Sequence, residues 1–152
     1  MNGVEWHLLL NHFPIVGTIF TAGFFAAGVI FRQFTLIQAA LISYIVIALI
    51  AIPVYFTGEQ AEAIVEERPG INPELIKAHE EHGVNAFILV EITGLAALIA
   101  LLAGIEKKEK TGMIGMIAFI ISLLAIVFAV MAGSSGGKIS HPELRQERII
   151  DE

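Results

Sequence analysis

Four long apolar runs constrain the fold of this chain more than any other feature of its sequence. They cover about residues 8–31, 35–56, 84–105 and 113–132, and each is long enough to span the hydrocarbon layer of a membrane. The lipid interior admits only helices and closed barrels as spanning structures, and these runs lack the alternation that strands show. The sequence therefore predicts an all-α, integral membrane four-helix bundle.

The composition also indicates that lipid covers much of the surface. The chain has 152 residues, of which 56% are hydrophobic and 16% are charged, whereas a soluble domain carries about 25% charged residues. A core of this size is too small to hide the excess of apolar side chains. The lack of cysteine excludes disulfides, thiolate metal sites and covalently attached haem, and the net charge of −6 argues against a nucleic-acid partner. We expect one membrane domain over residues 1–152.

Charges in the connections predict which way the spans run. The turn with Arg32 and the turn at 106–110 share one side, which holds four basic residues against two acidic ones. The other side carries the N-terminus, the 57–83 connection and the 133–152 tail, with five basic residues against twelve acidic ones. Short loops rich in Lys and Arg face the cytoplasm. We therefore expect a multi-pass protein of the bacterial inner membrane, with both termini and the 57–83 connection on the outer side.

The 57–83 connection is expected to form a partly helical outer loop. Residues 57–60 (Thr-Gly-Glu-Gln) have the form of a capping box that begins a short helix. A Pro-Gly pair at 69–70 then stops it, and an Asn-Pro-Glu run at 72–74 supplies an N-cap and a proline at the first helical position. That second helix is expected to continue into the third span. In the tail, the glycines at 136–137 are expected to let the chain fold back over the end of the bundle.

All five histidines lie in segments that this topology places on the outer side. They are His7, His12, His79, His82 and His141. Imidazole is the commonest protein ligand for metals, and it also binds haem iron. Spans one and three both begin on the outer side, so imidazoles near these two ends can approach each other across the bundle. The pattern favours a shared ligand site over the plainer interpretation, in which the histidines are solvated or interfacial side chains.

Three stretches together resemble a family of small four-span bacterial membrane proteins. The stretches are HLLLNHFP at 7–14, TGEQAE at 57–62 followed by HEE at 79–81, and GGKISH at 136–141. The resemblance covers nearly the whole chain and implies that four histidines belong to the family pattern: His7, His12, His79 and His141. It implies that His82 is an addition, and that Ser140 stands where the family favours arginine. The resemblance implies these site residues and no particular activity.

The first functional hypothesis is a b-type haem protein that transfers electrons at the outer face of the membrane. In this interpretation His12 and His79 are the axial ligands of haem b. The flat macrocycle would lie against Phe13, Val16 and the residues of the third span below His79. The remaining histidines would be second-site ligands, supporting contacts or a reserve ligand: His7, His141 and His82.

Two alternatives of other classes stay open. A zinc, copper or iron ion suits a set of imidazoles and carboxylates made of His7, His12, His79, His141, Glu59 and Glu62. In the second alternative, the chain is a structural accessory subunit of a respiratory complex. No nucleophile–base pair, phosphate loop or metalloprotease motif is visible, so no independent catalytic activity is expected. The expected partners are the lipid bilayer and a respiratory-chain protein, a cytochrome or a quinone, with a homo-oligomer as a further option.

Glu91 is the one acidic residue within an apolar run. An ionisable group at this depth is costly and is a functional candidate by default. Glu91 lies on the opposite side of the helix from His82, so we expect it to make a contact separate from the histidines. We interpret it as a neutral acid that is hydrogen-bonded between helices.

Overall fold

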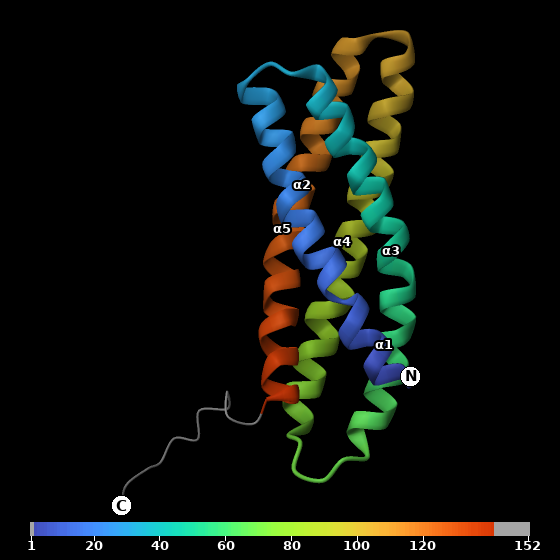
Figure 1. The fold of residues 1–152 in the computed structure, drawn as a ribbon, viewed down its shortest axis with the longest axis vertical. Helices are drawn as coiled ribbons and strands as arrows, with labels where there is room; N and C mark the ends of the chain where they lie inside the picture. Colours follow the sequence, from blue (N-terminus) through green and yellow to red (C-terminus); the bar gives the residue numbers. More distant parts are fainter. Residues whose placement is uncertain (1, 142–152) are drawn as a thin grey trace, which may run out of the picture.

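The computed structural model describes residues 2–141, and its helices form a four-helix bundle (Figure 1). The helices are α1 (Gly3–Leu10), α2 (His12–Ile30), α3 (Phe34–Glu66), α4 (Pro73–Glu106) and α5 (Lys108–Ser140). α1 and α2 follow each other as one segment, so four helical segments are long and apolar enough to cross a membrane. The described residues contain no strand. The predicted all-α four-helix bundle is therefore confirmed, and the chain is a multi-pass membrane protein.

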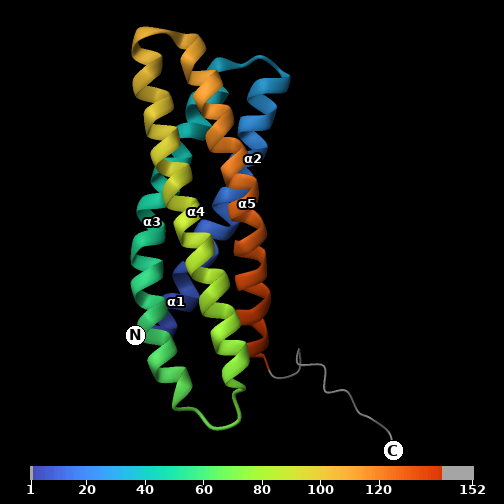
Figure 2. The same ribbon diagram turned by 180° about the vertical axis from the view of Figure 1, so that it is seen from behind.

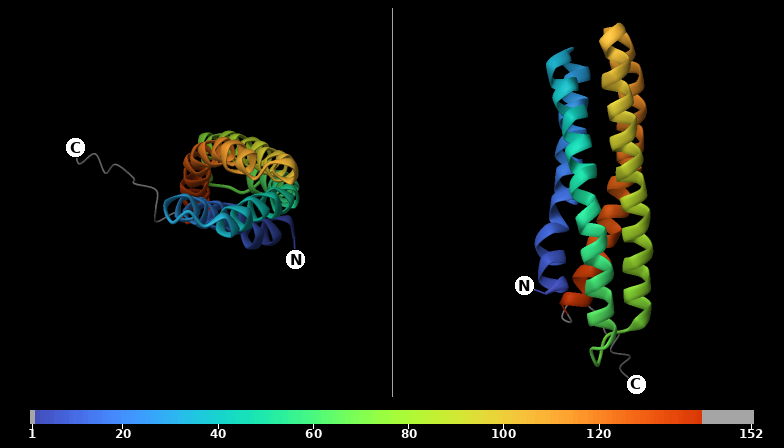
Figure 3. Two further views of the ribbon diagram at one scale, coloured as in Figure 1. Left: turned by 90° about the horizontal axis from the view of Figure 1, so that it is seen from above. Right: turned by 90° about the vertical axis from the view of Figure 1, so that its right-hand side faces the viewer.

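The chain runs up and down the bundle, which brings all the histidines to one end. α1 and α4 begin at this end, and α3 and α5 finish at it (Figures 1 and 2). The two tight connections, at residues 31–33 and at Lys107, lie at the opposite end. We call these the histidine end and the turn end. Around the bundle, α2 packs on α3 and α5, and α4 packs on the same two helices (Figure 3).

α3 extends well beyond the apolar run that predicted it. It continues to Glu66, so the predicted capping box at 57–60 does not begin a new helix. The Thr57 hydroxyl instead donates back to the carbonyls of Pro53 at 2.9 Å and Val54 at 3.0 Å. A side chain caps a helix only where backbone N–H groups lack a carbonyl partner within the helix. Here the carbonyls of the preceding turn already accept from these N–H groups. The helix predicted from Thr57 is therefore present as a continuation of α3 and not as a separate helix, and residues 67–72 connect α3 to α4.

The signals that separate α3 from α4 are confirmed. Gly70 adopts a positive φ of 83°, a conformation that glycine reaches without steric cost. The Asn72 side chain then accepts a hydrogen bond from the Glu74 backbone N–H at 2.9 Å, and Pro73 is the first residue of α4. The helix continues from there through the third span without a break, as expected.

α5 also continues past its predicted end. It runs to Ser140, so the prediction that the glycines at 136–137 bend the tail is wrong. Glycine costs only about 1 kcal/mol in a helix, and packing of α5 along α4 outweighs that preference. The rest of the predicted 133–152 tail, residues 142–152, lies outside the described residues.

The first span is broken between α1 and α2, at Asn11. Pro14 has no N–H group, so it cannot donate to the carbonyl of Leu10, where α1 ends. The break leaves the Asn11 side-chain oxygen buried without a hydrogen-bond partner among the described residues. α1 itself begins with a capping box, in which Asn2 and Glu5 each accept the other's backbone N–H at 3.0 and 2.9 Å.

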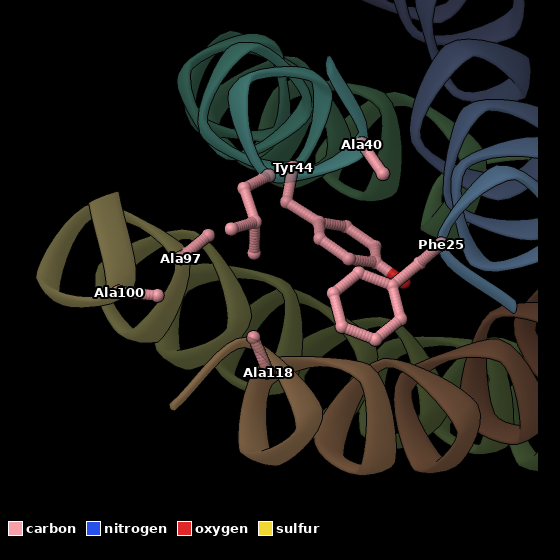
Figure 4. Close-up of a cluster of buried hydrophobic side chains, with 7 residues drawn as sticks. Phe25, Ala40, Tyr44, Ala97, Ala100 and Ala118 are labelled. Atoms are coloured by element: carbon pink, nitrogen blue, oxygen red, sulfur yellow. The ribbon is translucent and has the colours of Figure 1, made fainter. Parts of the chain in front are cut away.

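One buried cluster of the core lies in the half of the bundle nearer the turn end. Its fully buried aromatic side chains, Phe25 and Tyr44, lie among alanines of three helices (Figure 4). The Tyr44 hydroxyl donates to Ser122 Oγ at 2.7 Å, and Ser122 donates in turn to the carbonyl of Phe119 at 2.7 Å. These hydrogen bonds join α3 to α5, and they give the buried hydroxyls of both Tyr44 and Ser122 a partner.

Large apolar side chains lie on the outside of the bundle, and small ones lie on the inside. Ile30 and Ile105 are 72% and 80% exposed, whereas Ala97, Ala100 and Ala118 are fully buried. This arrangement is typical of helices in lipid, where association depends on close backbone approach and not on hiding apolar groups from water. It accounts for the excess of apolar residues in the composition.

Candidate functional site

A cavity of about 370 Å³ lies between the helices at the histidine end. This volume falls in the range of small-molecule sites. Apolar side chains of every helix make up most of its wall, including Ile15 of α2, Val54 of α3, Val84 of α4 and Ile139 of α5. The buried cluster around Phe25 and Tyr44 thus lies toward the turn end, and the cavity lies at the histidine end.

The cavity gathers six of the residues that the sequence predicts for the site. These are His7, His12, Glu59, Glu62, His79 and His141. His82 does not line the cavity, although it lies only three residues beyond His79 on α4. The four histidines that carry the resemblance are thus the four that share the cavity.

His7 is held at the cavity by a hydrogen bond from α1 to α3. Its ring is half-buried, and Nδ1 lies 3.2 Å from the carbonyl oxygen of Val54. A carbonyl oxygen only accepts, so Nδ1 is the nitrogen that carries the proton and donates. The other nitrogen, Nε2, is then the one available to a ligand, which is the usual arrangement for a metal-binding histidine.

His79 is held in the same way, from α4 to α5. Nδ1 donates to the carbonyl oxygen of Ala132 at 2.9 Å, and Ser135 Oγ lies 3.4 Å from the same nitrogen. The rings of His79 and His7 are neighbours in a T-shaped arrangement, with centroids 6.1 Å apart and planes at 83°. The structure therefore brings together two imidazoles from different helices, each fixed through Nδ1.

The other two cavity histidines are placed differently. His12 is exposed, and its Nδ1 donates to the carbonyl of Leu8 on the preceding turn at 3.2 Å. His141 is the exposed C-cap of α5, and its backbone N–H donates to the carbonyl of Gly137 at 2.9 Å. The ring that neighbours His79 is thus that of His7, and the predicted pairing of His12 with His79 stays a prediction.

Two of the side chains expected to contact a macrocycle lie away from the cavity. Phe13 and Val16 are 57% and 45% exposed and do not line the cavity, so this expectation is wrong. Pro14 and Ile15 of α2 line the cavity instead. The flat apolar wall comes from Tyr55 and Phe87, whose rings stack with centroids 4.7 Å apart and planes at 24°. Phe87 belongs to the third-span residues expected below His79, whereas sequence reasoning missed Tyr55, although it lies close to the histidine end of an apolar run.

The charged side chains along the cavity are acidic. Glu59, Glu62 and Glu80 line it, and no Lys or Arg among the described residues does so. Sequence reasoning missed Glu80, which directly follows His79. Within residues 2–141 no group of three His, Asp or Glu side chains is close enough to hold one metal ion. The cavity therefore has two neighbouring imidazoles and acidic side chains around them. The described residues do not form a complete ligand set for a bare metal ion.

Glu91 lies apart from the cavity. It is half-buried on α4, and its Oε1 is buried without a hydrogen-bond partner among the described residues. The expected hydrogen bond to another helix is therefore not formed at this oxygen.

No family model, curated protein or solved structure matches this chain. The resemblance to small four-span bacterial proteins therefore stays a prediction. The chemistry of the cavity is what supports a function.

Proposed function

We propose that this protein binds haem b between His7 and His79 and transfers electrons at the histidine end of the bundle. The observation that supports this proposal is the 6.1 Å separation of two imidazoles across an apolar cavity. Two metal–imidazole bonds of about 2 Å on opposite faces of one iron place the ring centres roughly 6 Å apart. Histidines on facing helices of a bundle are a common way to hold such a cofactor.

The ligand count favours haem over a bare zinc, copper or iron ion. Protein sites for such ions generally use three or four side-chain ligands. The described residues hold no group of three that could do this. A porphyrin supplies the equatorial nitrogens itself, so that the protein needs to provide only two imidazoles.

The residues around the pair have roles that suit this cofactor. The carbonyls of Val54 and Ala132 hold Nδ1 of the two rings, so that Nε2 of each is the nitrogen without a proton and could bind iron. The aromatic rings of Tyr55 and Phe87 line the cavity and would give the macrocycle apolar contacts. When bound, the haem would supply one-electron chemistry, and nearby carboxylates would stabilise the more positive, oxidised iron. The acidic lining would repel the carboxylates of a haem.

Electrons would pass to a partner that docks at the histidine end. The candidates are a cytochrome, another respiratory-chain protein or a quinone. The excess of acidic residues on this side of the sequence favours a partner with a basic docking surface, because complementary charges steer encounter.

The test of the proposal is the visible spectrum of the protein purified in detergent from haem-replete cells. We expect a Soret band and split α and β bands on reduction, as two imidazole ligands give. A colourless protein with stoichiometric zinc, copper or iron would contradict haem and support an ion site. A colourless protein without metal would support a structural accessory subunit.

We further propose that the histidine end faces the outside of the bacterial inner membrane. The chain has no cysteine, so single Glu66→Cys and Lys108→Cys variants give a clean labelling experiment. In intact spheroplasts, a membrane-impermeant maleimide should label Glu66→Cys and not Lys108→Cys, because the basic turn stays in the cytoplasm. Both variants should be labelled after lysis. The reverse pattern would place the cavity on the cytoplasmic side.

A further inference from the structure

Two glycines lie directly under the imidazoles of His7 and His79. A Cβ atom built on Gly58 of α3 would come within 3.1 Å of His7 Cε1. A Cβ atom built on Gly136 of α5 would come within 2.9 Å of His79 Cε1. Both distances are shorter than an ordinary van der Waals contact. A side chain at Gly136 would therefore require a shift near the ring of His79, and a side chain at Gly58 would require the ring of His7 to give by a few tenths of an ångström.

The hydrogen bonds of the two rings follow the same pattern. His7 donates to the carbonyl of Val54, four residues before Gly58, and His79 donates to that of Ala132, four residues before Gly136. In a helix, the carbonyl four residues earlier lies against the N–H of the later residue. Each ring therefore occupies the corner between a helix carbonyl and the missing side chain of a glycine.

A hydroxyl residue completes each arrangement. Thr57 precedes Gly58 and donates to the Val54 carbonyl at 3.0 Å. Ser135 precedes Gly136 and donates to the Ala132 carbonyl, also at 3.0 Å. We call each set of accepting carbonyl, hydroxyl residue and glycine an imidazole seat. One seat lies at 54–58 and receives a ring from α1, and the other lies at 132–136 and receives a ring from α4.

We propose that Gly58 and Gly136 are positioning residues of two equivalent imidazole seats, which together hold one shared ligand group between His7 and His79. The rings are too close, at 6.1 Å between centroids, for two separate macrocycles to lie between them. The protein should therefore bind one group per chain, shared by His7 and His79, and not a separate group at each histidine. This inference depends on the proposed function only for the identification of that group as haem.

Neighbouring glycines on the cavity wall provide matched controls. Gly133 lies one turn before Gly136 on α5, and a Cβ atom there would have only an ordinary contact, 3.7 Å from Ile15 Cδ1. Gly83 lines the cavity from α4, and a Cβ atom there would meet no atom within 4 Å. Alanine at either control position adds the same methyl group without touching an imidazole.

The seats can be tested by NMR of the protein labelled with ¹⁵N-histidine in detergent micelles, with signals assigned through single His→Gln variants. In the wild type, Nδ1 of both His7 and His79 should carry the proton. Gly136→Ala should shift the ring signals of His79, and Gly58→Ala should shift those of His7 by less, since its contact is longer. Gly133→Ala and Gly83→Ala should shift neither. Unprotonated Nδ1 in the wild type, or unchanged signals in both seat variants, would overturn the inference.

A second readout is the haem retained per folded protein, with folding checked by gel filtration and far-UV circular dichroism. Changes to residues that orient a metal ligand typically lower affinity by about 10–100-fold, and we expect a loss of this order in Gly136→Ala. The wild type should hold one haem per chain, and a ratio of two would contradict the shared group. Should the ring signals shift as expected in a protein that never takes up haem, the seats stand and the proposed haem function fails.

Discussion

Replacing His79 by alanine is expected to remove haem b from a protein that still folds. The variant loses one of the two proposed iron bonds and the hydrogen bond to the carbonyl of Ala132. Residues that merely orient a metal ligand are worth about 10–100-fold in affinity, so the ligand itself should be worth at least that. The fold should survive, because the buried core around Phe25 and Tyr44 lies in the other half of the bundle. The measurement is Soret absorbance per folded protein.

His82 provides the matched control for this variant. It lies one helical turn further along α4 and does not line the cavity, so His82→Ala should keep its full haem content. Free imidazole added to His79→Ala should restore part of the Soret band, because the cavity then has room for the missing ring. Full haem in His79→Ala without added imidazole would show that the proposed ligand pair is wrong.

Variants of His7 and His12 distinguish the two competing ligand pairs. The neighbouring rings predict that His7→Ala loses haem as completely as His79→Ala. The pairing inferred from sequence predicts instead that His12→Ala is the second damaging variant. His12 donates to its own helix and is exposed, so we expect its removal to leave most of the haem in place.

The four spans could be predicted because apolar runs report contact with lipid. The apolar runs alone do not predict the ends of the helices, because a helix does not end where its lipid contact ends. α3 runs ten residues past the predicted end of its span at residue 56, since its polar continuation still has helical hydrogen bonds available. It ends at Glu66, shortly before the Pro-Gly pair at 69–70. The stop signal in the sequence was therefore the better guide to the length of the helix.

The site could be predicted as a set of residues but not as a geometry. Histidines on spans that start together were expected to meet, and four of them line one cavity. Which two rings are neighbours depends on the break at Asn11, which sets the direction of α1 independently of α2. Gly136 was interpreted through its backbone freedom, whereas its importance in the structure is the side chain it lacks. Sequence alone does not say which of these two properties of glycine is used.

The largest effect on stability is expected from Gly104→Ala at the turn end. α4 and α5 are in close contact here, and a Cβ atom on Gly104 would collide with Oγ1 of Thr111 and lie 3.2 Å from its Cβ. Thr111 is 1% exposed, so its side chain has little free space into which to move. The helices cannot separate easily, because Lys107 is the one residue between them. Overpacking of this kind typically costs about 1–3 kcal/mol.

The measurement is the unfolding of purified protein in mixed micelles as the fraction of SDS rises. Gly112→Ala is the matched control, since it adds a methyl group next to Thr111 where no atom lies within 4 Å. It should be neutral or slightly stabilising, because alanine favours the helix by up to about 1 kcal/mol over glycine. Haem per folded protein should be unchanged in both variants, because both positions are at the turn end. Equal stability of the two variants would contradict the close packing of α4 on α5.

The double variant Gly104→Ala/Thr111→Ala separates collision from any other effect of the added methyl group. Thr111→Ala alone removes packed atoms from a buried site and should destabilise the bundle. In the Gly104→Ala background the same change removes the atom that collides, so it should cost less or restore stability. The interaction free energy of this double-mutant cycle should then be favourable, by about 0.5–3 kcal/mol for residues in contact. Additive effects would mean that Gly104 is needed for a reason other than its contact with Thr111.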